Sequence, residues 1–270
     1  MHFHFVTLFP ELIKAFMGSG VMGQGQKKSL LSYNSTNPRE FTSDIHQSVD
    51  DRPFGGGDGM VMLAEPLAKA VDFCRQEEPE TLVVYLSPQG QRWSDQKARA
   101  LAERKPAHFT LVCGRYAGVD QRWIETHVDE EVSLGDFILS GGELAALAVA
   151  DSLGRLVPGV LGNRASSEQD SFAQEQLLEC PQFTRPREFR ELPVPEFLLS
   201  GNHKDIEAKR RAVSLLRTRF LRPDLWQSQS RDEREFLQAL SWALTLPETE
   251  LRSLGLQAEL PIPKKESYSS

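Results

Sequence analysis

The sequence predicts an α/β protein built on a parallel sheet, with a smaller helical domain towards its C-terminal end. Short apolar runs that read as strands alternate with segments of helical spacing as far as Arg155. Apolar strands joined by helices are typical of parallel sheets that are covered on both faces. Beyond Asp205 only helical spacing remains, interrupted by Pro223 and Pro247.

The first strand and helix open the chain. Residues 2–8 begin by alternating His and Phe, and this period of two is that of a strand. Pro10 marks the start of a helix, and Leu12, Ile13 and Phe16 follow at helical spacing. The chain therefore begins with a strand followed by a helix.

Two more strand–helix pairs follow. A strand at 81–86 is ended by the loop 87–90, and a strand at 109–113 ends at Gly114. The expected helices lie at about 94–103, from about Asp120, and at 143–155, 205–221 and 231–246. The helix at 143–155 is largely apolar, so we expect it in a core or in a subunit interface.

These patterns divide the chain into four segments. We expect an α/β domain at 1–160, a linker at 161–176, a helical domain at 177–250 and a partly disordered tail at 251–270. The linker lacks periodicity and contains Gly, Asn, Ser, Glu and Asp, although a functional segment is the alternative interpretation.

Composition indicates a globular protein. Of the 270 residues, 40% are hydrophobic and 26% are charged, which argues against a disordered chain or a fibrous repeat. No apolar run approaches the roughly 18 residues of a membrane-spanning helix. Cys74, Cys113 and Cys180 are far apart, so neither a disulfide framework nor a thiolate zinc site is predicted, and the cytoplasm is the expected location.

The charge distribution bears on nucleic-acid binding. A net charge of −7 argues mildly against a polyanionic partner, because such binding usually leaves a basic footprint. Between Arg185 and Arg222, however, Lys and Arg outnumber Asp and Glu. This basic run is either a surface for phosphates or an ordinary solvated helix face, and its charge alone does not decide between them.

Several loops could hold a ligand. The glycine-rich run 55–59 could cradle an anion, but it lacks the Walker ending and the Rossmann spacing, so a flexible turn is the stronger interpretation. The loops 87–90, 114–118 and 133–142 are more informative, because ligands of parallel sheets bind beyond the carboxyl ends of the strands. Glycines there would let the backbone approach a flat nucleoside, while simple turns are the alternative.

Six runs of the sequence together resemble one known family. They are VDDRPFGGG at 49–57, YLSPQG at 85–90, CGRY at 113–116, GDFILSGGE at 135–143, PGVLG at 158–162 and LLSGNH at 198–203. In this order they look like the bacterial tRNA (guanine-N1)-methyltransferase family, and the match covers roughly residues 1–222.

The resemblance implies a SPOUT methyltransferase whose parallel sheet carries a deep trefoil knot. Fold rules exclude knots in general, so periodicity could not have predicted one. It also implies a homodimer with a shared active site, and methylation of N1 of guanine 37 in tRNA, 3′ of the anticodon, which prevents frameshifting. The expected partners are thus tRNA and a second copy of the chain, without DNA or a membrane.

The same resemblance assigns S-adenosylmethionine to the three loops. The expected contact residues are Tyr85, Leu86, Ser87, Pro88, Gly90, Gly114, Arg115, Tyr116, Leu134, Gly135, Asp136, Phe137, Ile138, Leu139, Gly141 and Gly142.

Methylation of guanine N1 requires a base for the N1 proton and a donor for the charge that develops on O6. Asp170 matches the catalytic aspartate of the family and Arg155 its catalytic arginine. Glu168 is a rival carboxylate, but the family motif places the base directly before Ser-Phe. Magnesium supports transfer in this family, and because the sequence shows no separate metal cluster, an ion would sit among these carboxylates and the substrate.

One position departs from the family. Ala117 stands where a Glu is common after Gly-Arg-Tyr, which removes a carboxylate expected near the cofactor. Asp120 or Glu130 is a candidate to compensate. The basic run 185–222 is the expected contact for tRNA phosphates. Two other functions stay open: a knotted methyltransferase with another RNA target, and a non-catalytic nucleotide-binding or RNA-binding module, for which no base would be needed.

Overall fold

The structure is a computed structural model, and it describes residues 1–105, 107–162, 170–173 and 175–256. The chain divides into two compact units, Met1–Ser167 and Glu168–Ser270. Since residues 163–169 lie outside the described residues, the boundaries expected at 160 and 176 stay predictions.

The first unit is built on a five-stranded sheet in the order β2-β1-β6-β5-β7. Every neighbouring pair in this sheet is parallel, as the sequence predicts, and His2 of β1 pairs with both Ser32 and His108. The strands are β1 (His2–Val6), β2 (Ser32–Thr36), β5 (Leu82–Arg92), β6 (His108–Val112) and β7 (Glu130–Ser133), and a short antiparallel pair is formed by β3 (Asp50–Asp51) and β4 (Val61–Met62).

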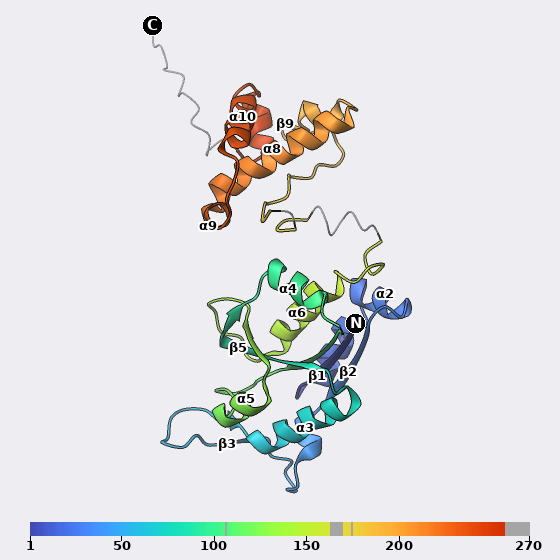
Figure 1. Cartoon of the computed structure of the whole chain (residues 1–270), viewed down its shortest axis with the longest axis vertical. Helices are drawn as coiled ribbons and strands as arrows, with labels where there is room; N and C mark the ends of the chain where they lie inside the picture. The colour runs from blue at the N-terminus through green and yellow to red at the C-terminus, as the bar shows by residue number, and fades with distance from the viewer. Residues whose placement is uncertain (106, 163–169, 174, 257–270) are drawn as a thin grey trace. The chain divides into compact units, whose positions relative to one another are not determined.

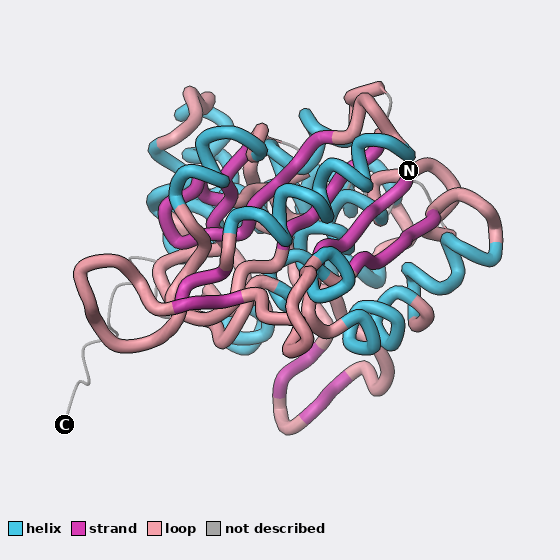
Figure 2. The backbone as a smooth tube through the Cα atoms, turned by 90° about the horizontal axis from the view of Figure 1, so that it is seen from below, coloured by secondary structure: helices cyan, strands magenta, loops and turns pink. Residues whose placement is uncertain are grey.

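Helices cover both faces of this sheet (Figure 1). One buried core contains Phe3, Phe5 and much of α6, while the other contains Val6, Val83 and residues of α3 and α5. Figure 2 shows strands side by side with helices over them. The helices of this unit are α1 (Pro10–Met17), α2 (Gly20–Lys27), η1 (Pro38–Phe41), α3 (Ala64–Glu77), α4 (Asp95–Ala102), α5 (Gln121–His127) and α6 (Glu143–Gly154).

Strand β5 differs from the prediction, because it does not end at the loop 87–90. Leu86 and Gln91 both pair with Val132, so the chain leaves the ladder after Leu86 and rejoins it at Gln91. Gly90 lies against the backbone of β7, where an added Cβ would come within 2.3 Å of Val132 N. Only a glycine leaves room for the chain to pass this close to the backbone of β7. The loop 87–90 is thereby fixed against β7.

Several elements of the first unit are not predicted by the sequence. The strands β2 and β7 are short, polar and at the two edges of the sheet, so they lack an apolar run. Helix α2 contains three glycines and has low apolar periodicity, although Met22 is buried. Tertiary packing, which places these segments against β1, β5 and α6, decides their structure where local pattern does not.

The second unit is mainly helical, as predicted. Its core contains Phe197, Val213 and Leu216 together with Ala239 and Ala243. Its elements are β8 (Glu188–Phe189), β9 (Leu192–Pro193), η2 (Glu196–Leu199), α8 (His203–Leu221), α9 (Pro223–Gln227), α10 (Glu233–Ala243) and α11 (Glu248–Ser253).

The beginning of the expected tail belongs to this core instead. Helix α11 runs to Ser253, and Leu251, Leu254 and Leu256 are almost completely buried. The expectation of a tail from residue 251 was therefore wrong for 251–256, because its leucines complete the apolar core; residues 257–270 lie outside the described residues. Within the described residues, no helix has both the length and the apolar character needed to cross a membrane.

Candidate active site

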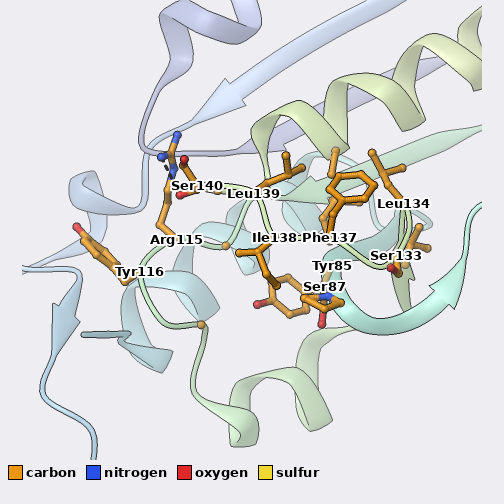
Figure 3. A pocket seen from close by; sticks show the side chains of 18 of the residues that line it. Tyr85, Ser87, Arg115, Tyr116, Ser133, Leu134, Phe137, Ile138, Leu139 and Ser140 are labelled. Carbon is orange, nitrogen blue, oxygen red and sulfur yellow. Dashed lines mark hydrogen bonds between the residues drawn. The ribbon is translucent and has the colours of Figure 1, made fainter. Parts of the chain in front are cut away.

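A pocket lies where β5 leaves the ladder after Leu86 and at the carboxyl ends of β6 and β7, so that the three glycine-containing loops meet there (Figure 3). Its lining consists of Tyr85, Leu86, Ser87, Pro88, Gly114, Arg115, Tyr116, Ala117, Gly118, Val132, Ser133, Leu134, Gly135, Phe137, Ile138, Leu139, Ser140, Gly141, Gly142 and Ala145. The structure thus brings together segments that lie up to about 60 residues apart in the sequence, on the side of the sheet where ligands of parallel sheets bind.

All the expected cofactor residues except Gly90 and Asp136 line this pocket. Gly90 instead packs against β7, and Asp136 is exposed. Val132 and Ala145 also line the pocket, although the sequence predicts neither as a site residue. Val132 belongs to the short polar strand β7, and Ala145 lies in the first turn of α6, so neither carries a loop signal.

Two hydrogen bonds tie the loops of the pocket to each other. The backbone N–H of Gly142 donates to the carbonyl of Gly114 at 2.8 Å. The guanidinium of Arg115 donates to the carbonyl of Ser140 at 3.1 Å, as Figure 3 shows. The loop after β6 and the loop after β7 therefore form one connected wall.

Arg115 is held in place by a buried acid. The Glu143 side chain is 1% exposed, and its carboxylate accepts from Arg115 Nε at 3.1 Å and lies 2.8 Å from Arg115 Nη2. Thr7 Oγ1 donates to the same carboxylate at 2.9 Å, and the guanidinium stacks over the Phe9 ring at 4.2 Å. A carboxylate buried in this way needs such partners, because an unpaired buried charge is costly.

Tyr85 closes the base of the pocket. Burial, with a further contribution from Glu131, raises the pKa of its phenol to about 12, so the hydroxyl is neutral near pH 7. A Cβ added at Gly114 would come within 2.9 Å of the Tyr85 ring. A glycine at this position therefore leaves the ring in place and the Gly114 backbone open to a ligand.

Ala117 also lines the pocket, beside Tyr116, which has a φ of 60°. Neither residue expected to compensate for Ala117 is part of the lining. Asp120 caps α5 and pairs with Arg122 at 2.7 Å, whereas the carboxylate of Glu130 pairs with Lys97 at 2.6 Å. Among the described residues, the pocket lining contains no carboxylate.

The two expected catalytic residues belong to different units. Arg155 is the C-cap of α6 in the first unit. Asp170 is in the second unit, where its backbone carbonyl accepts from Ala173 N at 3.2 Å. The rival carboxylate, Glu168, lies outside the described residues.

Asp170 lines a groove of the second unit together with side chains of α8. The cations Lys204, Arg210 and Arg211 lie along this groove, and its other lining residues are His203, Leu177, Leu178, Glu179, Cys180, Gln182, Ile206, Glu207, Ala208 and Ser214. A row of cations is suited to bind a polyanion. A carboxylate beside these cations can accept a proton from a group that the polyanion presents. The basic run of the sequence therefore contributes to this groove.

Comparisons with known proteins agree with this geometry. The family model described as tRNA (Guanine-1)-methyltransferase TrmD matches residues 1–228. A tRNA (guanine-N(1)-)-methyltransferase of Vibrio atlanticus is 49% identical over 236 residues, which cover 87% of this chain and 95% of that protein. One of Shewanella piezotolerans is 51% identical over 224 residues, covering 83% of this chain and 89% of that protein.

A solved structure is similar as well. The crystal structure of tRNA (m1G37) methyltransferase from Aquifex aeolicus superimposes with a TM-score of 0.63 at 38% sequence identity. The superposition covers 77% of this chain and 86% of that chain.

The parallel sheet, the pocket at its strand ends and the similarity to the solved methyltransferase define a knotted α/β methyltransferase of the SPOUT class. The chain belongs to the tRNA (guanine-N1)-methyltransferase family. Its activity is that of the family, the transfer of a methyl group from S-adenosylmethionine to N1 of guanine 37 in tRNA.

Proposed function

We propose that the pocket at the ends of β5, β6 and β7 binds S-adenosylmethionine. The residues present fit a nucleoside: the lining is mainly apolar side chains and glycine backbone, which suit an adenine face and its polar edge. Added Cβ atoms at Gly141 and Gly142 would lie within 2.3 Å of Arg115 Nε and 2.8 Å of Cys113 Cα. These glycines therefore keep the cradle open, and the bound cofactor supplies the methyl group.

Asp170 then acts as the base. Methylation removes the proton on N1 of guanine while negative charge develops on O6, so the carboxylate of Asp170 accepts that proton. Arg155 donates to O6 and stabilises the charge. Support comes from the groove of the second unit, which places Asp170 beside the cations of α8 that suit an RNA backbone.

The substrate guanine has to be accessible to this carboxylate. A base in an anticodon loop is exposed from its stack at lower cost than one in a duplex, so the loop is a suitable target. Phosphates on either side would bind the basic run 185–222, including His203, Lys204 and Arg210 in the groove. Methylation next to the anticodon supports maintenance of the reading frame.

The active form is a homodimer whose active site is shared between subunits. Several large apolar side chains near the pocket are exposed in the single chain, and burying them would favour association. They are Phe9, Leu12 and Phe16 at and in α1, Ile138 in the pocket wall and Leu144 in α6. A second copy would cover these residues and supply the Asp170 that the pocket of the first copy lacks within its own unit.

Three further assignments complete the proposal. The protein acts in the cytoplasm, and the catalytic domain, the linker and the tRNA-binding domain follow the division at residues 160 and 176, with the tRNA-binding domain extended to residue 256. Magnesium supports transfer; the described residues contain no group of three His, Cys, Asp or Glu side chains placed for a metal ion. Assays with EDTA, followed by restored Mg²⁺, test the requirement.

The decisive experiment is methyl transfer from labelled S-adenosylmethionine to unmodified tRNA with guanine or adenine at position 37. Wild-type protein should label only the guanine tRNA. Asp170→Ala should lower the rate by about 10² to 10⁴, the usual contribution of a general base. Full activity of Asp170→Ala would exclude this carboxylate as the base, and equal labelling of both tRNAs would contradict the target position.

A further inference from the structure

The turn that carries Asp170 has an unusual backbone. Phe172, Glu175 and Gln176 have φ values of 74°, 49° and 56°, in the left-handed region that side chains disfavour. Residues in this region keep such a conformation only where surrounding contacts hold them. The contacts of this turn therefore decide whether Asp170 is held in one place.

Glu175 provides several of these contacts. Its carboxylate accepts from Arg211 Nη2 of α8 at 3.0 and 3.2 Å. Its backbone carbonyl accepts from Arg231 Nη2, before α10, at 2.6 Å, and Arg231 Nη1 lies 4.0 Å from the Glu175 carboxylate. One residue is thus bound through both side chain and backbone by two arginines.

The two arginines are themselves fixed. Arg211 also hydrogen-bonds Glu235 of α10, with Nη2 and Oε2 3.0 Å apart. The Arg231 side chain is 5% exposed and its guanidinium stacks over the Trp226 ring at 5.2 Å. Burial lowers the pKa of Arg231 while Glu175 acts to raise it, so Glu175 supplies charge compensation to a buried cation.

The turn links Glu175 and its two arginine partners to Asp170. Ala173 N donates to the Asp170 carbonyl at 3.2 Å, and Phe172 N donates to the Leu177 carbonyl at 2.7 Å. Just beyond, Leu178 N donates to Thr218 Oγ1 of α8 at 2.8 Å. A displacement of Glu175 would therefore be passed through Leu177 and its hydrogen bond with Phe172 to Asp170.

We propose that Glu175 is a positioning residue for methyl transfer: by binding Arg211 and Arg231 it holds the Asp170 turn in the conformation in which the carboxylate accepts the N1 proton. The inference rests on the proposed role of Asp170 as the base. In this role Glu175 acts through the turn and not by contact with the reacting atoms. Without the contacts of Glu175 with Arg211 and Arg231, the turn adopts other conformations. At any moment only a fraction of the molecules then holds Asp170 where it can accept the proton.

The test compares single-turnover methyl transfer, at saturating tRNA and cofactor, for wild type and Glu175→Gln. The variant should lower the rate by about tenfold to 100-fold, the effect of a catalytic group misplaced by about 1 Å. The KM for S-adenosylmethionine should stay within about twofold, since the cofactor pocket lies in the other unit. Glu175→Asp, which keeps the charge, should restore part of the rate.

Glu233→Gln is the matched control. Glu233 is an exposed acid in the first turn of α10, and its substitution removes the same charge from the same unit. This control should transfer at the wild-type rate. A Glu175→Gln rate within about twofold of wild type, or a Glu233→Gln rate that falls equally, would overturn the proposal.

A double variant separates positioning from a structural role. If Glu175 acts through Asp170, Asp170→Asn/Glu175→Gln should be no slower than Asp170→Asn alone, whereas independent effects would multiply and overturn the proposal. An unaffected Asp170→Asn would instead remove the proposed base. If Glu175→Gln does not fold, Glu175→Asp and Asp170→Asn/Glu175→Asp form the same cycle.

Discussion

At the scale of single residues, His4 couples stability to pH. It is buried in β1, where its Nε2 lies 2.6 Å from Thr36 Oγ1. Burial lowers its pKa to about 4, with a smaller contribution from His2, even though the Glu77 carboxylate lies 3.8 Å from Nδ1. The desolvation of the ring therefore outweighs this half-exposed acid.

We predict a loss of stability as the pH falls. An unfolded chain binds a proton on His4 below about pH 6.5, while the folded protein does so only below about pH 4. Between these values the free energy of unfolding should decrease by up to about 1.4 kcal/mol per pH unit. Urea unfolding from pH 7 to pH 5 measures this decrease.

His4→Gln should flatten this dependence, because the variant has no ring to protonate. His46→Gln is the control, since His46 is exposed. Equal slopes for wild type, His4→Gln and His46→Gln would show that other groups cause the effect.

Single residues also show which parts of the candidate site the sequence predicts and which parts it does not. The Gly-rich loops could be read as a nucleoside site, because strand ends and glycines are local signals. The pairing of Glu143 with Thr7 and Arg115 could not, since Thr7 and Glu143 are 136 positions apart. The only local signal is an acid, Glu143, as the first residue of the apolar helix α6. A favourable charge at the start of a helix would explain such an acid equally well.

At the scale of elements, the approach of α6 to the loop after β6 depends on Gly142. A Cβ there would lie 2.8 Å from Cys113 Cα and 2.9 Å from Gly114 N, and these backbone atoms cannot rotate away. We predict that Gly142→Ala lowers the free energy of unfolding by about 1–3 kcal/mol, as overpacking does. The displaced loop should weaken binding of S-adenosylmethionine by about tenfold or more.

Calorimetric titration and urea unfolding measure the two effects. Gly162→Ala is the control, because no atom lies within 4 Å of an added Cβ at that glycine. Wild-type affinity in Gly142→Ala would mean that the loop is not part of the cofactor site.

The elements were predicted unevenly, for physical reasons. Apolar strands at 81–86 and 109–113 and the helices after Asp120 and Ser94 were recognisable because burial and capping leave local patterns. The edge strands β2 and β7 were missed, since neighbours supply their hydrogen bonds while their own side chains stay polar. Strand β5 rejoins the ladder at Gln91 because the chain passes close to the backbone of β7. No local sequence pattern predicts this contact.

At the scale of the whole molecule, a shared active site can be tested by mixing two impaired variants at a concentration of S-adenosylmethionine too low to saturate Gly142→Ala. Gly142→Ala impairs the cofactor pocket and Asp170→Ala removes the base. If each site combines the pocket of one subunit with Asp170 of the other, a mixed dimer has one intact site. Random mixing should then restore roughly a quarter of the wild-type activity, since half of the dimers are mixed.

Refolding the two variants together and assaying methyl transfer gives the result. The same variants refolded separately and then combined without exchange are the control, and they should show only the residual activity of Gly142→Ala. A mixture that is no more active than this control, although native mass spectrometry shows it to contain mixed dimers, would place the pocket and Asp170 of each site in the same subunit.

The knot and the partner had to come from family resemblance, because sequence periodicity describes elements and not the path that joins them. Residues 1–228 carry that resemblance, and the parallel order of the sheet agrees with it. The negative net charge of the whole chain argues mildly against an RNA partner. The cations along α8 favour such a partner.

The position of β1 in the sheet bears on how the protein is made. This strand is synthesised before both of its neighbours, since it lies between β2 and β6, and His2 pairs with His108. A ribosome adding roughly 5–20 residues per second needs about 5–20 s to synthesise the chain from His2 to His108. During this interval the Phe3 and Phe5 side chains of the nascent chain lack one neighbouring strand, so the central strand of the sheet can complete its pairing only after more than a hundred further residues have been made.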